Sequence, residues 1–190
     1  MTATLFLTIA LFLAIGLLSH TSQMLPMNAS GAETTSPTTT KFIDYDGTKY
    51  GFHVQYPANW NTTEDQSAVW FVSPVDSTGN IRIERQPTSN LSLSDLVNVQ
   101  LLQSKDSYKD FKVLSSNTTS LDGNPANRTD YQFKIEEPKF LGVDVFDFTA
   151  IQISTIKNNS FYTFLYYSNL ENFHIFLPIA EKMISTLRLE

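Results

Sequence analysis

Histidine, cysteine and carboxylate side chains supply most of the chemistry that proteins carry out, and this chain holds three histidines and no cysteine. No two of the histidines, His20, His53 and His174, have the HxH or HxxxH spacing that brings two ligands to one metal ion. The absence of cysteine excludes a disulfide framework, a thiolate metal site and a cysteine nucleophile. A histidine-based site would have to be assembled from residues far apart in the sequence.

Carboxylates gather around a predicted hairpin turn at residues 138–142: Glu136, Glu137, Asp144 and Asp147. Oxygen-rich clusters hold hard cations such as Ca²⁺, so a metal-binding module at residues 136–147 is one alternative function. The spacing is not that of an EF-hand loop, and the neighbouring Lys134 and Lys139 favour an ordinary charged rim. No metal ligand is therefore predicted.

A hydrolase-type enzyme, with a site formed by scattered polar residues such as His53 and Asp147, is a second alternative. Asp147 shares its strand parity with Val145 and Ile151, so we expect it to be paired or to lie beside a bulge. The sequence contains neither a Gly-x-Ser-x-Gly elbow nor a glycine-rich phosphate loop. We predict no catalytic residue and no cofactor.

The charge balance bears on the class of partner. Thirteen Lys and Arg against nineteen Asp and Glu give a net charge of −6, and there is no run of basic residues. Nucleic acid is excluded as a predicted partner, because proteins that bind it present basic patches to the phosphates. Residues 41–190 are long enough to form one domain with its own core.

The amino-terminal residues predict export. Residues 2–18 form an uncharged apolar block, and the first charged residue is Glu33. The block is longer than the core of most signal peptides and shorter than the ~20 residues of a full membrane span. We predict that residues 1–22 are a signal peptide or a membrane anchor. In both cases the rest of the chain is extracytoplasmic, either secreted or held at the cell surface.

Residues 23–40 are predicted to be a Ser/Thr/Pro-rich linker, acting as a stalk or a spacer, because such a segment buries too little apolar surface to order itself. Asn-x-Ser/Thr triplets support the extracytoplasmic location and are candidate glycosylation sites. They are Asn28, Asn61, Asn90, Asn117, Asn127 and Asn158. The polar surroundings of Asn61, Asn117 and Asn158 predict loops or turns at these three positions.

Period-two alternation of apolar and polar residues predicts half-buried strands at residues 52–56, 81–84 and 131–135. Residues 143–156 and 161–167 are apolar on both faces, which is typical of central strands covered on both sides.

Two helices are predicted. Ser92 and Asp95 form a capping box ahead of a helix that ends near residues 105–107. The second lies near the carboxyl end, with Pro178 in its first turn. The pattern indicates an α+β fold with a mostly antiparallel sheet.

The order of these segments resembles the PsbP-like domain family. Residues 50–60, Tyr-Gly-Phe-His-Val-Gln-Tyr-Pro-Ala-Asn-Trp, are similar to the opening motif of that family. Val-Trp-Phe-Val-Ser-Pro at residues 69–74 resembles its next strand, and Leu-Asp-Gly-Asn-Pro-Ala at residues 121–126 resembles a turn further on. The likeness covers nearly all of residues 41–190.

The resemblance implies an α/β/α sandwich, in which helices flank a central, mostly antiparallel sheet. It also implies a non-enzymatic role, since members of the family act mostly as extrinsic or assembly subunits of membrane complexes, or as secreted proteins. The cationic docking features of the photosynthetic members are missing here, so photosystem binding is not implied. The prediction is a non-enzymatic, extracytoplasmic binding or assembly module. Its partner would be a protein or small ligand, with membrane contact through residues 1–22 if they are retained.

Overall fold

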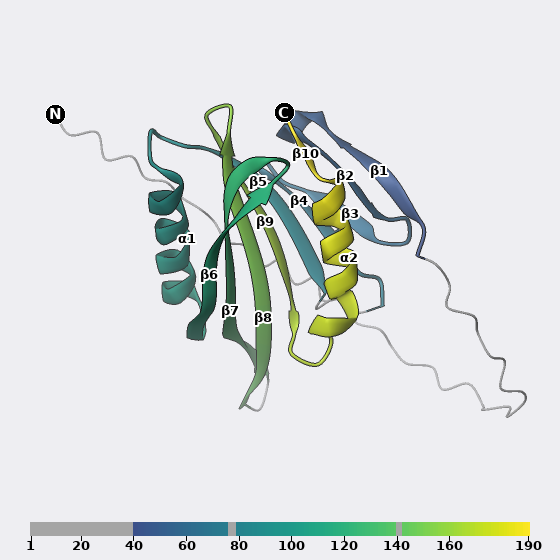
Figure 1. The fold of residues 1–190 in the computed structure, drawn as a ribbon. Helices are drawn as coiled ribbons and strands as arrows, with labels where there is room; N and C mark the ends of the chain where they lie inside the picture. Colours follow the sequence, from purple (N-terminus) through teal and green to yellow (C-terminus); the bar gives the residue numbers. More distant parts are fainter. Residues whose placement is uncertain (1–39, 76–78, 140–141) are drawn as a thin grey trace, which may run out of the picture. The chain divides into compact units, whose positions relative to one another are not determined.

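The computed structural model describes residues 40–75, 79–139 and 142–190, all within the unit Thr39–Glu190. The predicted leader, and all of the predicted linker except Thr40, lie outside the described residues. The described part of the chain forms two antiparallel sheets and two α-helices (Figure 1). No helix in this part is both long enough and apolar enough to cross a membrane.

The smaller sheet joins the two ends of the described chain. Its strands, in spatial order, are β1 (Phe42–Gly47), β2 (Phe52–Pro57) and β10 (Arg188–Leu189). A single 3-10 turn, Thr48–Tyr50, and then Gly51 connect β1 to β2. Gly51 has a φ of +73°, and a Cβ at this position would lie 2.6 Å from the hydroxyl of Tyr162, so the turn requires glycine.

The larger sheet has seven strands, and each neighbouring pair is antiparallel. In spatial order they are β3 (Asn61–Glu64), β4 (Ala68–Val72), β5 (Asn80–Pro87), β9 (Ser160–Asn169), β8 (Gly142–Lys157), β7 (Asn124–Lys139) and β6 (Lys109–Leu121). The predicted strands at residues 52–56, 81–84, 131–135, 143–156 and 161–167 all lie within observed strands.

Helix α1 (Leu93–Ser107) begins at the predicted capping box. The Ser92 hydroxyl accepts a hydrogen bond from the Asp95 amide at 3.2 Å, and the Ser92 amide donates to the Asp95 carboxylate at 3.3 Å. The helix ends at Ser107, inside the predicted range.

Helix α2 (Phe173–Thr186) starts earlier than predicted. Pro178 was expected in the first turn, but it lies inside the helix, with Phe173 as the first helical residue. The missing proline N–H leaves the carbonyl of His174 without its usual helical donor. The apolar residues of α2 outweigh this loss, because Phe173, Phe176 and Met183 are buried in the main core.

The main core lies on one face of the larger sheet. Even-numbered residues of β9, such as Phe164 and Tyr166, pack there with α2, and the smaller sheet covers part of the same face through Tyr45. The Tyr45 and Phe71 rings meet edge to face with 5.3 Å between centroids. On the other face, α1 forms a second cluster with Phe161 of β9.

The prediction of a mostly antiparallel sheet is confirmed, but the predicted α/β/α sandwich is only partly so. Helix α1 contacts β6, β7 and β8, whereas α2 contacts β2 and β9. Two helices of 15 and 14 residues cannot cover seven strands. The smaller sheet therefore does part of the covering that a helical layer would otherwise do, and the domain is dominated by its sheets.

Two predictions of burial need correction. Residues 81–84 were expected to be half-buried, yet both faces of β5 are covered here, and Arg82 and Glu84 form a buried ion pair with 2.7 Å between Nη2 and Oε1. Residues 143–156 were expected to be central throughout, yet β8 is mostly exposed before Phe148 and buried from Phe148 to Thr155. The reason is that β9 pairs only with residues 148–157 of β8.

Candidate functional site

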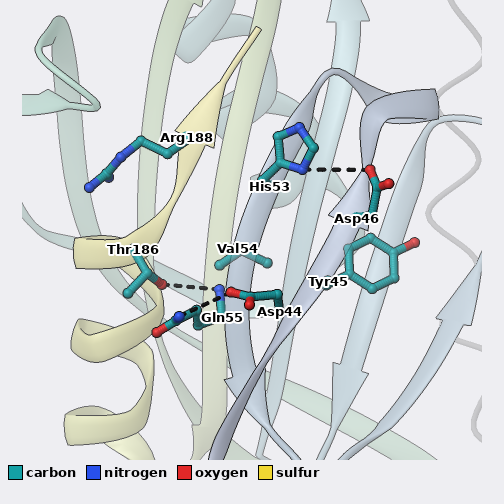
Figure 2. A pocket seen from close by; sticks show the side chains of 8 residues that line it. All are labelled: Asp44, Tyr45, Asp46, His53, Val54, Gln55, Thr186 and Arg188. Atoms are coloured by element: carbon teal, nitrogen blue, oxygen red, sulfur yellow. Dashed lines mark hydrogen bonds and ion pairs between the residues drawn. The ribbon is translucent and has the colours of Figure 1, made fainter.

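The outer face of the smaller sheet carries a hollow lined by polar side chains. Alternation along β1 and β2 turns Tyr45 and Val54 toward the core side, whereas Asp44, Asp46 and His53 face outward. The hollow has a volume of about 440 Å³ and is shown in Figure 2. We call it the β2 hollow; its lining residues are Asp44, Tyr45, Asp46, His53, Val54, Gln55, Thr186 and Arg188.

His53 lies at the centre of the polar contacts. Its Nε2 is 2.8 Å from Oε1 of Glu190, and its Nδ1 is 3.5 Å from Oδ1 of Asp46. Hydrogen bonds from the Thr48 hydroxyl at 2.6 Å, and then from the Thr48 amide at 3.1 Å, lower the pKa of Asp46 below its ordinary value. Asp46 is therefore a carboxylate at neutral pH.

The lower part of the hollow is a hydrogen-bonded row. The side-chain amide of Gln55 donates to Oδ1 of Asp44 at 3.0 Å. The backbone N–H of Gln55 donates to the hydroxyl of Thr186 at 3.1 Å (Figure 2). That hydroxyl in turn donates within α2, to the carbonyl of Met183 at 3.0 Å. Its proton is directed back into the helix and no histidine contacts it, so Thr186 is not placed as a nucleophile.

Arg188 supplies the one cation of the lining. Its guanidinium donates to the carbonyls of Leu187 at 2.7 Å and Ser185 at 3.3 Å, and its side chain extends away from His53 (Figure 2). Asp122 anchors this end of the hollow by accepting the Leu189 amide of β10 at 3.0 Å. The carboxylates of Asp44, Asp46 and Glu190 therefore outnumber the cation around His53, and the outer face is acidic.

A tyrosine and carboxylate network ties this sheet to the larger one. Glu64 of β3 accepts the hydroxyls of Tyr45 at 2.6 Å and Tyr50 at 2.9 Å. These hydrogen bonds lower the pKa of Glu64, and Lys49 at 3.6 Å acts in the same direction. Burial, followed by the bond to Glu64, raises the pKa of Tyr45. The two hydroxyls therefore donate to one carboxylate, which links β1 and the turn after it to β3.

The enzyme alternative is not supported by the geometry. His53 lines the β2 hollow, whereas Asp147 lines a separate, smaller hollow of about 140 Å³ beside Lys134 and Leu170. The two residues named as candidates for that site are therefore not brought together. His174 is exposed in the first turn of α2, and His20 lies outside the described residues.

Asp147 was predicted to be paired or to lie beside a bulge, and it faces a partner on the neighbouring strand. It lies on the exposed part of β8, opposite Lys134 in a continuous register with β7. The bond to Asp110 is the main cause that raises the pKa of Lys134, and the charge of Asp147 acts in the same direction, so the predicted pairing is present. Asp147 is nevertheless exposed, because the face that buries Ile151 is no longer covered at this position.

The carboxylates of residues 136–147 do not converge on a metal site. Glu136 pairs with Lys109 of β6, and Lys134 pairs with Asp110 at 2.8 Å. Within the described residues no group of three or more histidine, aspartate or glutamate side chains could hold a metal ion. The expected charged rim is present, with its ionic partners contributed largely by β6.

The candidate glycosylation residues differ in their surroundings. Asn61, Asn90, Asn117 and Asn158 are exposed, whereas Asn28 lies outside the described residues. The expected turn is present at Asn158, but Asn61 and Asn117 lie in strands β3 and β6. Asn127 is half-buried, and its side chain bonds Ser116 at 3.2 Å and Thr129 at 2.8 Å. Asn127 is therefore the least accessible of the described triplets.

Most of the β2 hollow was not predicted from the sequence. His53 was singled out, but its partners Asp46 and Glu190 were not. The alternation at residues 43–46 could have indicated a strand with Asp44 and Asp46 on one face. Nothing local indicates Glu190, which lies 137 positions from His53 in the sequence.

Solved structures with the same arrangement define the class of fold, which is PsbP-like. A scan against protein families and a search of curated proteins find no match. The cyanobacterial PsbP (CyanoP) from Synechocystis sp. PCC 6803 is similar with a TM-score of 0.59 and 14% identity, over 84% of this chain and 98% of that one.

Two further solved structures share the fold. The Pseudomonas aeruginosa protein of unknown function PA94 has a TM-score of 0.55 and 18% identity, over 78% of this chain and 97% of its own. The Saccharomyces cerevisiae Ran-binding protein Mog1p has a TM-score of 0.54 and 8% identity, over 80% of this chain and 96% of its own. The PsbP-like fold implied by residues 50–60 is thus confirmed.

Proposed function

We propose that this chain is a non-enzymatic binding module whose ligand is a cationic group of a protein or small molecule, held in the β2 hollow. The observation that carries the proposal is the acidic rim of that hollow. Asp46 and Glu190 contact His53, Asp44 contacts Gln55, and Arg188 is the only lysine or arginine of the lining. A volume of about 440 Å³ lies in the range of small-ligand sites.

The contacts of the hollow support binding over catalysis. His53 faces two carboxylates and no hydroxyl nucleophile, and the Thr186 hydroxyl donates to its own helix. A hydrolase needs a nucleophile or an activated water within hydrogen-bond reach of a base. The fold is also compatible with a binding role, since one protein that shares it, Mog1p, is described as Ran-binding.

Binding at the β2 hollow is tested with the peptide acetyl-Gly-Arg-Gly-amide, titrated into the full chain while amide resonances are followed by NMR. We expect saturable binding that weakens about fivefold or more in the Asp44→Asn/Asp46→Asn variant, since each exposed ionic contact contributes up to about 1 kcal/mol. The peptide acetyl-Gly-Glu-Gly-amide is the matched control and should not bind. Equal affinity of the double variant for the arginine peptide would contradict the proposal.

We further propose that the module works outside the cytoplasm. The support is in the sequence: the apolar block at residues 2–18, the Ser/Thr/Pro-rich segment behind it and the six Asn-x-Ser/Thr triplets. Mass spectrometry of the protein isolated from its native cells tests this, because it reports cleavage and glycosylation together. We expect a processed amino terminus, or membrane-associated protein with the terminus retained, and glycan on exposed residues such as Asn158. Recovery from the cytosol with an intact terminus and unmodified asparagines would refute it.

A further inference from the structure

The outer part of β8, residues 142–147, has one strand edge that no described strand pairs with. Strand β7 pairs with all of β8, but β9 stops at Asn169, opposite Phe148. Figure 1 shows β7 and β8 continuing beyond the end of β9. The amide of Leu170 donates to the carbonyl of Asp147 at 3.0 Å, and this is the last contact that closes the edge.

The direction of that last hydrogen bond fixes which backbone groups face outward. Alternate residues of an antiparallel strand direct their N–H and C=O groups to the same side. Since Asp147 faces the β9 side, Val145 and Val143 face it too. Both residues therefore offer a donor and an acceptor at an edge that is open within the described part of the chain, which suits an added strand.

The side chains along this edge are apolar and accessible. Val143 is 54% exposed, Val145 is 48% exposed and Phe146 is 38% exposed. Leu170 and Ile175, where the chain passes from β9 into α2, are more than half exposed as well. Alternating apolar residues on an exposed strand provide the contacts that give an added strand its affinity.

The opposite edge of the hairpin is protected and this one is not. The outer part of β7 contains Pro138, which has no N–H to donate, and charged residues that discourage strand addition. Residues 142–147 of β8, Gly-Val-Asp-Val-Phe-Asp, contain neither proline nor lysine. The difference indicates that the β8 edge is adapted for pairing.

Charge decides which strand fits. Residues 134–147 contain four carboxylates and two lysines, so this stretch of the chain carries a net negative charge. A second copy of the chain would bring two acidic hairpins together, and like charges on neighbouring strands are destabilising. An incoming strand with apolar residues beside the valines and lysine or arginine on its other face would suit both the apolar pattern and the net negative charge of the hairpin.

We propose that the edge of residues 142–147 in β8 is a β-augmentation site for an extended partner segment in which apolar residues alternate with lysine or arginine. The backbone groups of Val143 and Val145 pair with the partner, and the net negative charge of residues 134–147 favours its positive charge. The site is separate from the β2 hollow, so failure of one proposal leaves the other standing.

The test uses the full chain and the probe peptide acetyl-Lys-Val-Lys-Val-Lys-amide, with hydrogen exchange of individual amides followed by NMR. We expect the peptide to slow exchange at Val143 and Val145 and to leave the β2 hollow unchanged. Val145→Pro removes an edge donor and should weaken binding about tenfold, the equivalent of one or two hydrogen bonds. Val145→Ala keeps the donor and should bind more tightly than Val145→Pro.

Three results would overturn the proposal. One is unchanged exchange at Val143 and Val145 when the peptide is saturating. Another is equal binding of acetyl-Glu-Val-Glu-Val-Glu-amide, which would remove the role of charge. The third is protection of the same amides that rises with protein concentration in the absence of peptide, since that result would assign the edge to a second copy. The melting temperature of Val145→Pro shows whether its loss of binding reflects unfolding.

Discussion

Replacing Glu84 with alanine is expected to lower the free energy of unfolding by about 3–5 kcal/mol, the typical cost of leaving a buried charge without its partner. The side chains of Arg82 and Glu84 are only 9% and 5% exposed, and they meet at 2.7 Å. The Arg82 guanidinium also lies 5.1 Å from the centre of the Trp70 ring, and its Nε has no hydrogen-bond partner within the described residues. Without Glu84, the buried guanidinium of Arg82 would lose its carboxylate partner.

Urea unfolding measures this loss, read as a lower midpoint at an unchanged slope. The double variant Arg82→Met/Glu84→Leu is the control for burial, because replacing both charges with apolar groups should recover most of the lost stability. Asp130→Ala removes the partly exposed pair of Asp130 with Arg128 and should cost about 1 kcal/mol or less. A loss from Glu84→Ala no larger than that of Asp130→Ala would show that the buried pair is not structurally important.

Replacing Leu187 with alanine is expected to cost about 2–5 kcal/mol and to weaken ligand binding at the β2 hollow. Leu187 is fully buried in the main core, and it ends α2 by donating its amide to the carbonyl of Met183 at 3.0 Å. The next residue is Arg188 of β10, which pairs with His53 in the register of the smaller sheet. A cavity at Leu187 would therefore loosen the wall of the β2 hollow as well as the core.

Leu187→Met is the matched control, because it keeps nearly the same volume and should cost less than about 1.5 kcal/mol. Thermal unfolding gives the stability change, and titration with acetyl-Gly-Arg-Gly-amide gives the change in binding. Full stability in Leu187→Ala would contradict the role assigned to this residue in the core. Unchanged affinity in a destabilised but folded variant would show that β10 is not needed to form the hollow.

Periodicity predicted the positions of the strands well, but it predicted less well which faces of the strands are buried. The alternation at residues 52–56 gave both the strand and its buried face, because one side of the smaller sheet faces solvent. The same alternation at residues 81–84 gave the strand but placed Arg82 and Glu84 outside, since period two identifies a face and not what covers it. Only the three-dimensional arrangement shows that the second face of β5 is also buried.

The β2 hollow could be predicted only in part, because it depends on pairing between distant residues. His53 was recognisable as an outward-facing residue of β2. Strand β10, however, pairs with β2 although most of the domain's sequence lies between them. That long-range pairing brings Glu190 to 2.8 Å from His53. The resemblance at residues 50–60 predicted the fold but not this contact. The motif contains His53, whereas its partners Asp46 and Glu190 lie outside the motif.

The titration of the full chain with acetyl-Gly-Arg-Gly-amide, followed residue by residue, tests the central claim most directly. We expect the largest amide shifts at Asp44, Asp46, His53 and Gln55, and we expect the peptide to be recovered chemically unchanged. Shifts confined to other parts of the molecule, or cleavage of the peptide by the protein but not by the Asp44→Asn/Asp46→Asn variant, would contradict it.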